Sequence, residues 1–136
     1  MIRMEQATKP YDLCGEVIGA GMKVHSALGP AFLESVYQNA LIWGLRKCGF
    51  KAEAERPISV QYDGQMIGAF TADVFINDSL IVELKASQSL AKAHEVQLVN
   101  YLVATRLDEG LLLNFGTERL EFKKKFRLPK KEQVSF

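Results

Sequence analysis

The sequence predicts an α/β (α+β) fold, in which helices flank one central mixed β-sheet. Two kinds of apolar pattern support this prediction. Apolar residues recur with helical spacing in three segments, at residues 12–28, 31–48 and 90–106. Strand-like patterns occupy five others, at residues 52–62, 65–76, 80–87, 110–115 and 118–127. The resulting order is two helices, three strands, one helix and two strands.

Composition indicates one folded domain covering residues 1–136. Of the 136 residues, 48% are hydrophobic and 24% charged, with a net charge of +1, which excludes a disordered chain. No apolar run approaches the roughly 20 residues of a membrane span, and the first residues lack the apolar segment of a secretory signal. We therefore expect a cytoplasmic protein with no membrane partner. Its core should span about residues 12–127, followed by a basic C-terminal tail at 128–136.

The first two helices are predicted from their apolar faces. In residues 12–28 this face consists of Leu13, Val17, Ile18, Met22 and Val24. Glycines at positions 15, 19 and 21 weaken this helix but permit close packing against another one. In residues 31–48 the face consists of Phe32, Val36, Ala40, Leu41 and Leu45. The Gly29-Pro30 pair separates the two helices, and Gly49 is a typical stop for the second.

The strands are predicted from alternation and from turn residues. Asp63-Gly64 is a strong two-residue hairpin signal between the first two strands. Residues 77–79 form the next turn, and residues 110–115 read as a buried strand because they are almost continuously apolar. Residues 118–127 alternate apolar and charged side chains, as an edge strand does. The core positions expected in helix 90–106 are Leu98, Val99, Leu102 and Val103.

The cysteines and histidines suggest no special chemistry. Cys14 and Cys48 are far apart in the sequence, so we expect two reduced and mostly buried thiols. Together with His25 and His94 they show none of the ligand spacings of zinc sites.

Charged residues interrupt two otherwise apolar strands. Asp73 lies within the second strand, and Glu83 and Lys85 lie in the third, on one face of it because strand side chains alternate. A three-residue turn at 77–79 would pair Ile76 with Leu80 and so bring Asp73 opposite Glu83. A two-residue turn would instead place Asp73 opposite Leu84 and separate the acids.

Two adjacent carboxylates are good ligands for a hard divalent cation, Mg²⁺ or Mn²⁺. The backbone carbonyl of Leu84 could add a ligand, and Lys85 could orient a water molecule or neutralise a phosphate. The ordinary structural alternative is a half-exposed hairpin in which Lys85 forms an ion pair with Asp73 or Glu83.

Polar residues of two helices could join this cluster. Glu34 could supply a third acid, although a favourable charge in the first turn of a helix is its common role. Gln97 and Tyr101 share one helix face and could hydrogen-bond a phosphate or water near the site, or simply form a helix rim beside the sheet. His94 shares that face and is expected to be a hydrogen-bonding or surface histidine.

Basic residues gather near the C-terminus. Residues 119–136 carry a net charge of +5, whereas the rest of the chain carries −4. Such a strip can bind phosphate backbones, and equally it can be a solvated edge strand where lysines discourage aggregation. The candidate nucleic-acid contacts within the predicted strand are Lys123, Lys124, Lys125 and Arg127.

Five sequence blocks, taken together, resemble the bacterial GxxExxY proteins of the PD-(D/E)XK nuclease-like superfamily. The blocks are GPAFLESVY (29–37), AD (72–73), IVELKA (81–86), HEVQLVNYL (94–102) and GLLLNFG (110–116). They occur in the family's order, and the resemblance covers roughly residues 12–127. One departure is Ala31, which stands at the position of the motif's glycine.

The resemblance implies an αβββαβ core like that of restriction-endonuclease-type nucleases. It also implies roles for six polar residues: metal ligands at Asp73 and Glu83, a catalytic lysine at Lys85, an assisting helix acid at Glu34, and neighbouring helix residues at Gln97 and Tyr101. The expected function is a Mg²⁺- or Mn²⁺-dependent phosphodiesterase acting on nucleic acid, with DNA favoured over RNA. A homodimer would suit cleavage of both strands of a duplex.

Two other functions remain open at this point. One is a non-catalytic module that binds nucleic acid or a protein on the same fold, because folds host many functions. The other is a small homo-oligomeric structural protein in which the acids form surface ion pairs.

Overall fold

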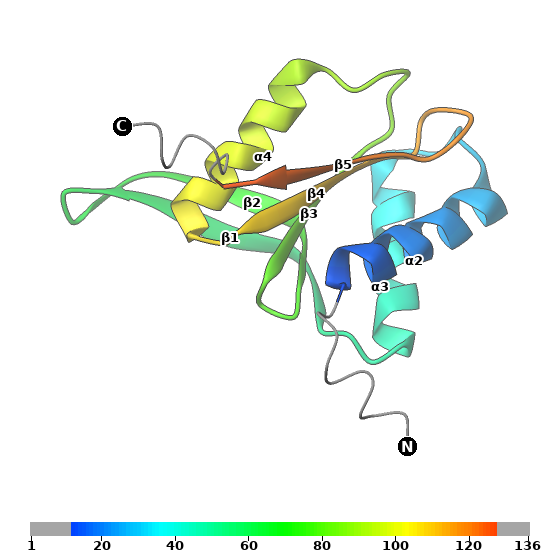
Figure 1. Cartoon of the computed structure of the whole chain (residues 1–136), viewed down its shortest axis with the longest axis horizontal. Coiled ribbons are helices and arrows are strands. Elements are labelled where there is room, and N and C mark those ends of the chain that lie inside the picture. The colour runs from blue at the N-terminus through cyan, green and yellow to red at the C-terminus, as the bar shows by residue number, and fades with distance from the viewer. Residues whose placement is uncertain (1–11, 128–136) are drawn as a thin grey trace.

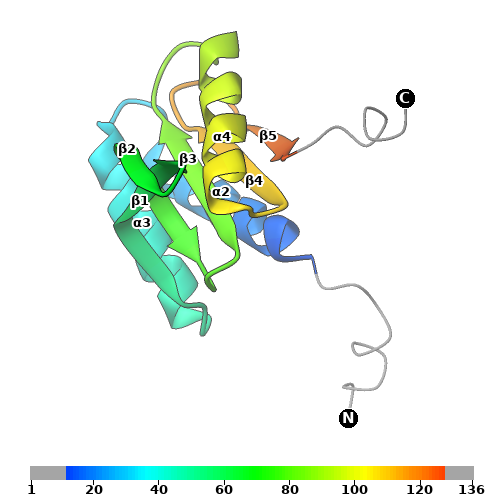
Figure 2. The ribbon, with the colours of Figure 1, turned by 90° about the vertical axis from the view of Figure 1, so that its left-hand side faces the viewer.

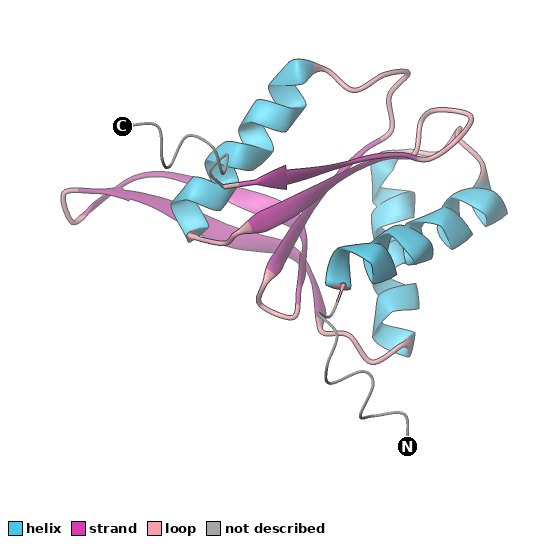
Figure 3. Cartoon of the chain, viewed as in Figure 1, coloured by secondary structure: helices cyan, strands magenta, loops and turns pink. Residues whose placement is uncertain are grey.

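The computed structural model describes residues 12–127. They form three helices and five strands (Figures 1 and 3). The helices are α2 (Leu13–Leu28), α3 (Glu34–Lys47) and α4 (Lys92–Thr105). The strands are β1 (Ala52–Tyr62), β2 (Gln65–Ile76), β3 (Leu80–Lys85), β4 (Glu109–Asn114) and β5 (Glu121–Phe126). This order of elements is the one that the sequence predicts.

The five strands form one mixed sheet in the order β1-β2-β3-β4-β5. Strands β1, β2 and β3 are antiparallel neighbours, β3 and β4 are parallel, and β5 is antiparallel to β4. The parallel pair requires a crossover, which α4 provides. Helices α2 and α3 cover one face of the sheet and α4 covers the other, as the side view in Figure 2 shows. The predicted mixed sheet flanked by helices is therefore confirmed.

The β1–β2 hairpin turns at Asp63 and Gly64, as predicted. Tyr62 pairs with Gln65 across this turn. Both turn residues have positive φ, 53° for Asp63 and 77° for Gly64. A tight hairpin turn of this hand requires that conformation at both central positions, which Asp-Gly adopts at little cost. The tip of the hairpin extends away from the rest of the molecule (Figure 1).

The face of α2 that meets the sheet differs from the predicted one. Its buried residues are Cys14, Val17, Ile18, Gly21 and His25, whereas Met22 is 47% exposed. A side chain at Gly21 would approach Leu120 to 3.2 Å and Leu113 to 3.4 Å. This glycine therefore lets α2 approach β4 and the segment before β5, rather than another helix. Met22 is exposed because the sheet contacts only this narrow stripe of α2.

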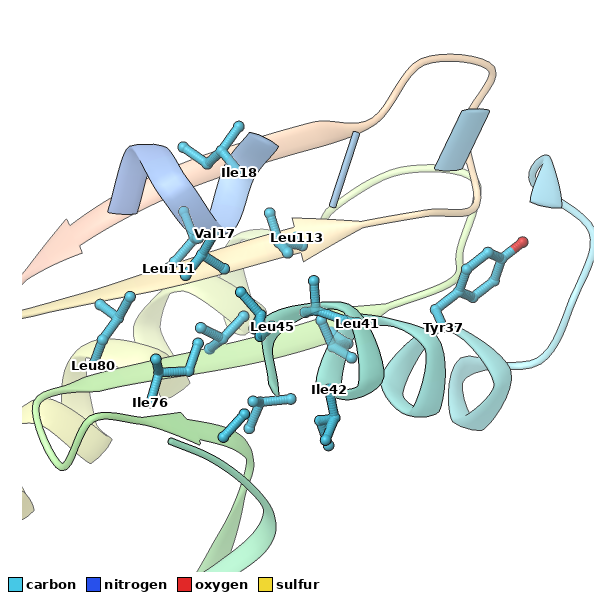
Figure 4. Close-up of a cluster of buried hydrophobic side chains, with 14 of the residues drawn as sticks. Val17, Ile18, Tyr37, Leu41, Ile42, Leu45, Ile76, Leu80, Leu111 and Leu113 are labelled. Atoms are coloured by element: carbon cyan, nitrogen blue, oxygen red, sulfur yellow. The ribbon is translucent and has the colours of Figure 1, made fainter. Parts of the chain in front are cut away.

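Helix α3 begins later than predicted, at Glu34, and buries Tyr37, Leu41, Ile42 and Leu45. Phe32 precedes the helix and is 47% exposed, so it is not the core residue that the spacing predicts. The buried α3 residues pack with α2 and with β2, β3 and β4 in one cluster, shown in Figure 4. Tyr37 lies at one end of that cluster (Figure 4).

A second, smaller cluster lies between the sheet and α4. The helix contributes Leu98, Tyr101 and Leu102 to it. The predicted core residue Val103 is 55% exposed, because it faces away from the stripe formed by these three residues. Within residues 12–127 no helix is both long enough and apolar enough to cross a membrane.

The two cysteines lie in different environments. Both are free, but only Cys14 is buried, so the prediction of a buried thiol is wrong for Cys48. The Cys14 thiol donates a hydrogen bond to Oε1 of Glu109 at 3.0 Å. Burial, together with the nearby Glu109 carboxylate, raises the pKa of this thiol to about 12. Cys14 is therefore an inert core residue rather than a nucleophile.

Candidate active site

The turn between β2 and β3 sets the position of the two acids. It has three residues, and Ile76 pairs with Leu80, as one of the two predicted registers requires. Pairing continues through Val74 and Val82 and stops there. The next position along the two strands is occupied by Asp73 and Glu83. The alternating strand pattern and the turn length therefore bring these carboxylates to one point.

At this point side chains take over the hydrogen bonds that strand pairing would otherwise make. The backbone N–H of Asp73 donates to Oε2 of Glu83 at 3.1 Å. The backbone N–H of Leu84 donates to Oδ2 of Asp73 at 2.8 Å. Each carboxylate is thus fixed by the other strand, and each retains one oxygen that these bonds do not use.

The two carboxylates disfavour each other's charge. Burial raises the pKa of Asp73, the hydrogen bond from the Leu84 backbone opposes this rise, and the charge of Glu34 adds to it. Burial and the neighbouring charge of Asp73 raise the pKa of Glu83 to about 8. Lys85 lowers the pKa of both acids, but not enough to cancel these effects. Such a pair gains most from a bound cation or a shared proton.

The donor set at this point fits a hard divalent cation. It offers the carboxylates of Asp73 and Glu83 and the backbone carbonyl of Leu84, the residue between Glu83 and Lys85. Oxygen donors of this kind are the ones that Mg²⁺ and Mn²⁺ select. Within the described part of the chain, no three His, Cys, Asp or Glu side chains lie close enough to hold one metal ion. Water or substrate would therefore complete the coordination.

Lys85 lies on the same face of β3 as Glu83 and is half-buried. The end of its strand is fixed from β4: the Lys85 carbonyl accepts a hydrogen bond from the Phe115 N–H at 2.8 Å. The Asn114 side chain accepts from the Ser87 N–H at 3.0 Å and donates to the Ser87 carbonyl at 3.0 Å. These bonds hold the backbone at Lys85 and just after it, and so restrict the direction of its side chain.

Glu34 reaches the same region from α3. It lines a hollow of about 190 Å³ together with Asp73 and Leu84. The Tyr37 hydroxyl, one turn later, donates to the Gly29 carbonyl and accepts from the Phe32 N–H, so it fixes the loop that leads to Glu34. The Tyr37 ring is fully buried and stacks on Phe115 with the ring centroids 4.6 Å apart.

The loop before α3 does not require a glycine at position 31, which Ala31 occupies. Its φ is not positive, so the position does not need the conformational freedom of glycine. Gly29 is the residue of this loop with left-handed φ, at 76°. The loop geometry before Glu34 therefore depends on Gly29 and Tyr37 rather than on position 31.

Helix α4 brings Tyr101 and Gln97 towards the acids. Tyr101 is 9% exposed and stacks on Phe70 with the ring centroids 3.7 Å apart. Burial raises its pKa, and the charges of Glu83 and Asp73 raise it further. Gln97 is exposed one turn earlier, and its side chain opposes this rise in the pKa of Tyr101. His94 accepts a hydrogen bond from the Ala91 N–H at 3.2 Å, which fits the structural role predicted for it.

Comparisons with known proteins place the chain in a family. The sequence profile of the PD-(D/E)XK nuclease superfamily matches residues 11–126. The chain belongs to the PD-(D/E)XK nuclease superfamily. A search of curated proteins gave no match.

One solved structure has a similar fold. The protein titled "Crystal structure of SSO0001" matches with a TM-score of 0.53 and 19% sequence identity. The match covers 96% of this chain and 77% of that one. At this identity the likeness concerns the fold alone.

The sequence analysis does not identify two residues that lie next to Asp73. Gln38 and Glu55 line the same hollow as Glu34 and Asp73. Glu55 lies in β1 between the residues that pair with Val74 and Ala72, and it has a φ of 53°, which is rare for a non-glycine residue within a strand. Gln38 follows Glu34 by one helical turn, and this i, i+4 spacing is the one signal that could have identified it.

The basic strand of this PD-(D/E)XK domain is partly engaged in ion pairs. Glu95 in the first turn of α4 lies 3.5 Å from Lys123 and 3.0 Å from Lys125. Arg127 pairs with Asp108 at 3.0 Å. Lys124 borders a separate hollow beside Glu109 and the start of α2. The basic tail at 128–136 lies outside the described residues.

Proposed function

We propose that this chain is a divalent-metal-dependent phosphodiesterase that hydrolyses nucleic acid. One observation carries the proposal: Asp73 and Glu83 are fixed side by side where β2 separates from β3. Lys85 lies on the same face as Glu83, and the chain belongs to a nuclease superfamily. This set matches the D and (D/E)XK letters of the superfamily's name.

The ion, Mg²⁺ or Mn²⁺, would be held by Asp73, Glu83 and the Leu84 carbonyl. When bound, such an ion stabilises charge on a phosphate and lowers the pKa of a water ligand. Lys85 neutralises the phosphate or orients the attacking water. Glu34, at the mouth of the hollow, adds negative charge on the side of Asp73, where it can orient a water molecule or assist a second ion.

The remaining assignments extend this proposal. Gln97 and Tyr101 hydrogen-bond the phosphate or a water molecule from α4. Lys123, Lys124, Lys125 and Arg127 contact the phosphate backbone, for which DNA is favoured over RNA. The chain is assigned to the GxxExxY group because Glu34 and Tyr37 match the E and the Y of that motif. A homodimer and a cytoplasmic location stay predictions.

A non-catalytic binding module is the second candidate function, and one observation favours it. Three of the four basic residues proposed to contact nucleic acid already pair with acids of the same chain. A net charge of +1 also gives little general attraction for a polyanion.

The test is incubation with single- and double-stranded DNA and RNA in Mn²⁺, Mg²⁺ or EDTA. Asp73→Asn, Glu83→Gln and Lys85→Met should each lower the cleavage rate at least about 100-fold, because each removes a group that acts on the metal or phosphate. Asp63→Asn at the hairpin tip is the matched control and should cleave like the wild type. Equal cleavage by all four variants would refute the site. Metal-independent nucleic-acid binding without cleavage would favour the binding module.

A further inference from the structure

Asp73 occupies a break in the pairing of β2 with both neighbours. Its register with β3 ends one residue away, at Val74. On the other side, the pairs between β1 and β2 include Ala54 with Val74 and Arg56 with Ala72, and the residue between them, Glu55, has left-handed φ. Asp73 therefore has no paired residue in either adjacent strand.

Two side chains bind the backbone of Asp73 in place of those pairs. Its N–H donates to Glu83 Oε2 at 3.1 Å. Its carbonyl accepts a hydrogen bond from Gln38 Nε2 at 2.8 Å. Because a partly buried peptide group needs hydrogen-bond partners, these two bonds determine the orientation of the Asp73 peptide units and so of its carboxylate.

Gln38 is well placed for this role. It is half-buried on α3, one turn after Glu34, and so joins that helix to β2. The same Nε2 atom also donates to Glu55 Oε2, at 3.2 Å. A primary amide has two N–H donors, so one side chain can make both bonds at once.

We infer that Gln38 is a positioning residue for the site, which holds Asp73 through its carbonyl in the orientation that binds the cation. This inference rests on the proposed metal-dependent function. Gln38 itself does not touch the ion. It acts on the ligand, as outer residues of metal sites do when they fix a carboxylate or imidazole, and their loss typically lowers metal affinity about 10–100-fold.

The first test compares Gln38→Leu with Asn39→Leu. Asn39 is the next residue of α3 and is exposed, so it controls for replacing an amide with an apolar side chain on this helix. Calorimetric titration with Mn²⁺ should show about 10–100-fold weaker binding for Gln38→Leu and unchanged binding for Asn39→Leu. In the metal-free protein, hydrogen exchange of the Leu84 amide should be faster in Gln38→Leu, because that N–H donates to the Asp73 carboxylate.

A charge swap separates the two bonds of Gln38. In the double variant Gln38→Glu/Glu55→Gln, the residues can again hydrogen-bond to each other, but position 38 no longer donates to the Asp73 carbonyl. We expect the swap to keep a melting temperature near that of the wild type while Mn²⁺ binding stays weak. Recovery of wild-type Mn²⁺ affinity in the swap would show that only the contact with Glu55 matters and would overturn the inference.

The outcomes also distinguish this inference from the proposed function. If the wild type binds Mn²⁺ and Gln38→Leu binds it equally well, the inference is wrong and the proposed function stands. If the wild type binds no Mn²⁺ and cleaves no nucleic acid, the proposed function fails and the inference fails with it.

Discussion

The two faces of the sheet are built for different tasks. Under α2 and α3, 16 buried residues form one continuous cluster, whereas under α4 the cluster has eight. The smaller cluster leaves the end of β3 free of apolar cover, and there Glu83 and Lys85 continue the face that begins with Ile81. Most of the apolar burial therefore lies on one face, and Glu83 and Lys85 lie beyond the smaller cluster on the other.

This difference explains how a chain of 136 residues can tolerate two adjacent acids whose pKa values are both raised. Keeping like charges together costs stability, and the larger cluster offsets that cost at a distance from the site. Substitutions on the two faces should therefore separate stability from metal binding.

The largest expected effect is on the face under α2 and α3. Leu41 is fully buried in the larger cluster, so Leu41→Ala should lower the free energy of unfolding by about 2–5 kcal/mol. Urea unfolding followed by circular dichroism measures this change. The control Leu33→Ala, at a position 77% exposed, should change stability by less than about 0.5 kcal/mol. Equal losses in both variants would show that the larger cluster is not the main source of stability.

The second effect is a pH dependence on the side of the site. The folded state raises the pKa of Glu83 from 4.5 to about 8, so between these values the folded protein binds more protons than the unfolded chain. Stability of the metal-free protein should therefore fall as pH rises through this window, while Mn²⁺ affinity rises because the ligand must lose its proton.

Urea unfolding at several pH values between 5 and 9 would measure how the free energy of unfolding changes with pH, with Glu83→Gln as the comparison. The slope should become much shallower in that variant. If the wild-type protein instead became more stable from pH 5 to pH 9, the raised pKa of Glu83 would be contradicted.

A smaller effect should follow from loss of the Tyr37 hydroxyl. Tyr37→Phe removes its bonds to the Gly29 carbonyl and the Phe32 N–H, and should cost about 1–3 kcal/mol because these groups lose a partner inside the protein. Thermal unfolding measures the loss, and Tyr62→Phe, at a tyrosine 72% exposed, is the control. A Tyr37→Phe protein as stable as this control would show that the loop does not depend on the hydroxyl.

The smallest change in stability is expected at the basic strand. The Lys125 hydrogen bond and the charge of Lys123 lower the pKa of Glu95. Because both lysines remain partly exposed to solvent and glutamine can still accept a hydrogen bond, Glu95→Gln should alter stability by less than about 1 kcal/mol. The same change should strengthen DNA binding and increase its salt dependence by freeing the two lysines. Filter binding at several salt concentrations measures the DNA affinity, and Glu118→Gln, at an exposed position, is the control. If Glu95→Gln leaves the DNA affinity unchanged, Lys123 and Lys125 do not contact the phosphates.

The sequence could predict the elements, but it left the meeting of Asp73 with Glu83 dependent on the length of one turn. Strand alternation has a period of two, so one turn length decides which residues face each other. The turn at 77–79 has the required length, and Asp63-Gly64 gives an unambiguous hairpin. The buried face of each helix was harder to predict, because a twisted sheet contacts a narrower stripe of a helix than the apolar spacing suggests. Met22 and Val103 are therefore exposed.

The surroundings of Asp73 could not be predicted, because alternation breaks there. Ala72 and Phe75 both join the cluster under α4, whereas Val74 joins the cluster on the opposite face. The left-handed conformation of Glu55 accompanies this change of face. A glutamate in a strand-like segment gives no sign of such a conformation, so Glu55 and its partner Gln38 emerge only from the three-dimensional structure.

The parallel pairing of β3 with β4 has a consequence for the order of folding. Strands β1, β2 and β3 are joined by short turns, whereas β4 reaches β3 only after a crossover of more than 20 residues. Closing a long loop costs more entropy than closing a short one, and contacts distant in sequence form more slowly. We therefore expect the meander that carries both acids to form first, and the direction of Lys85 to be fixed only when β4 docks. In pulse-labelled hydrogen exchange, amides of the β1–β2 hairpin should then become protected before those of β4, so that the chain brings Asp73 and Glu83 together before it orients Lys85.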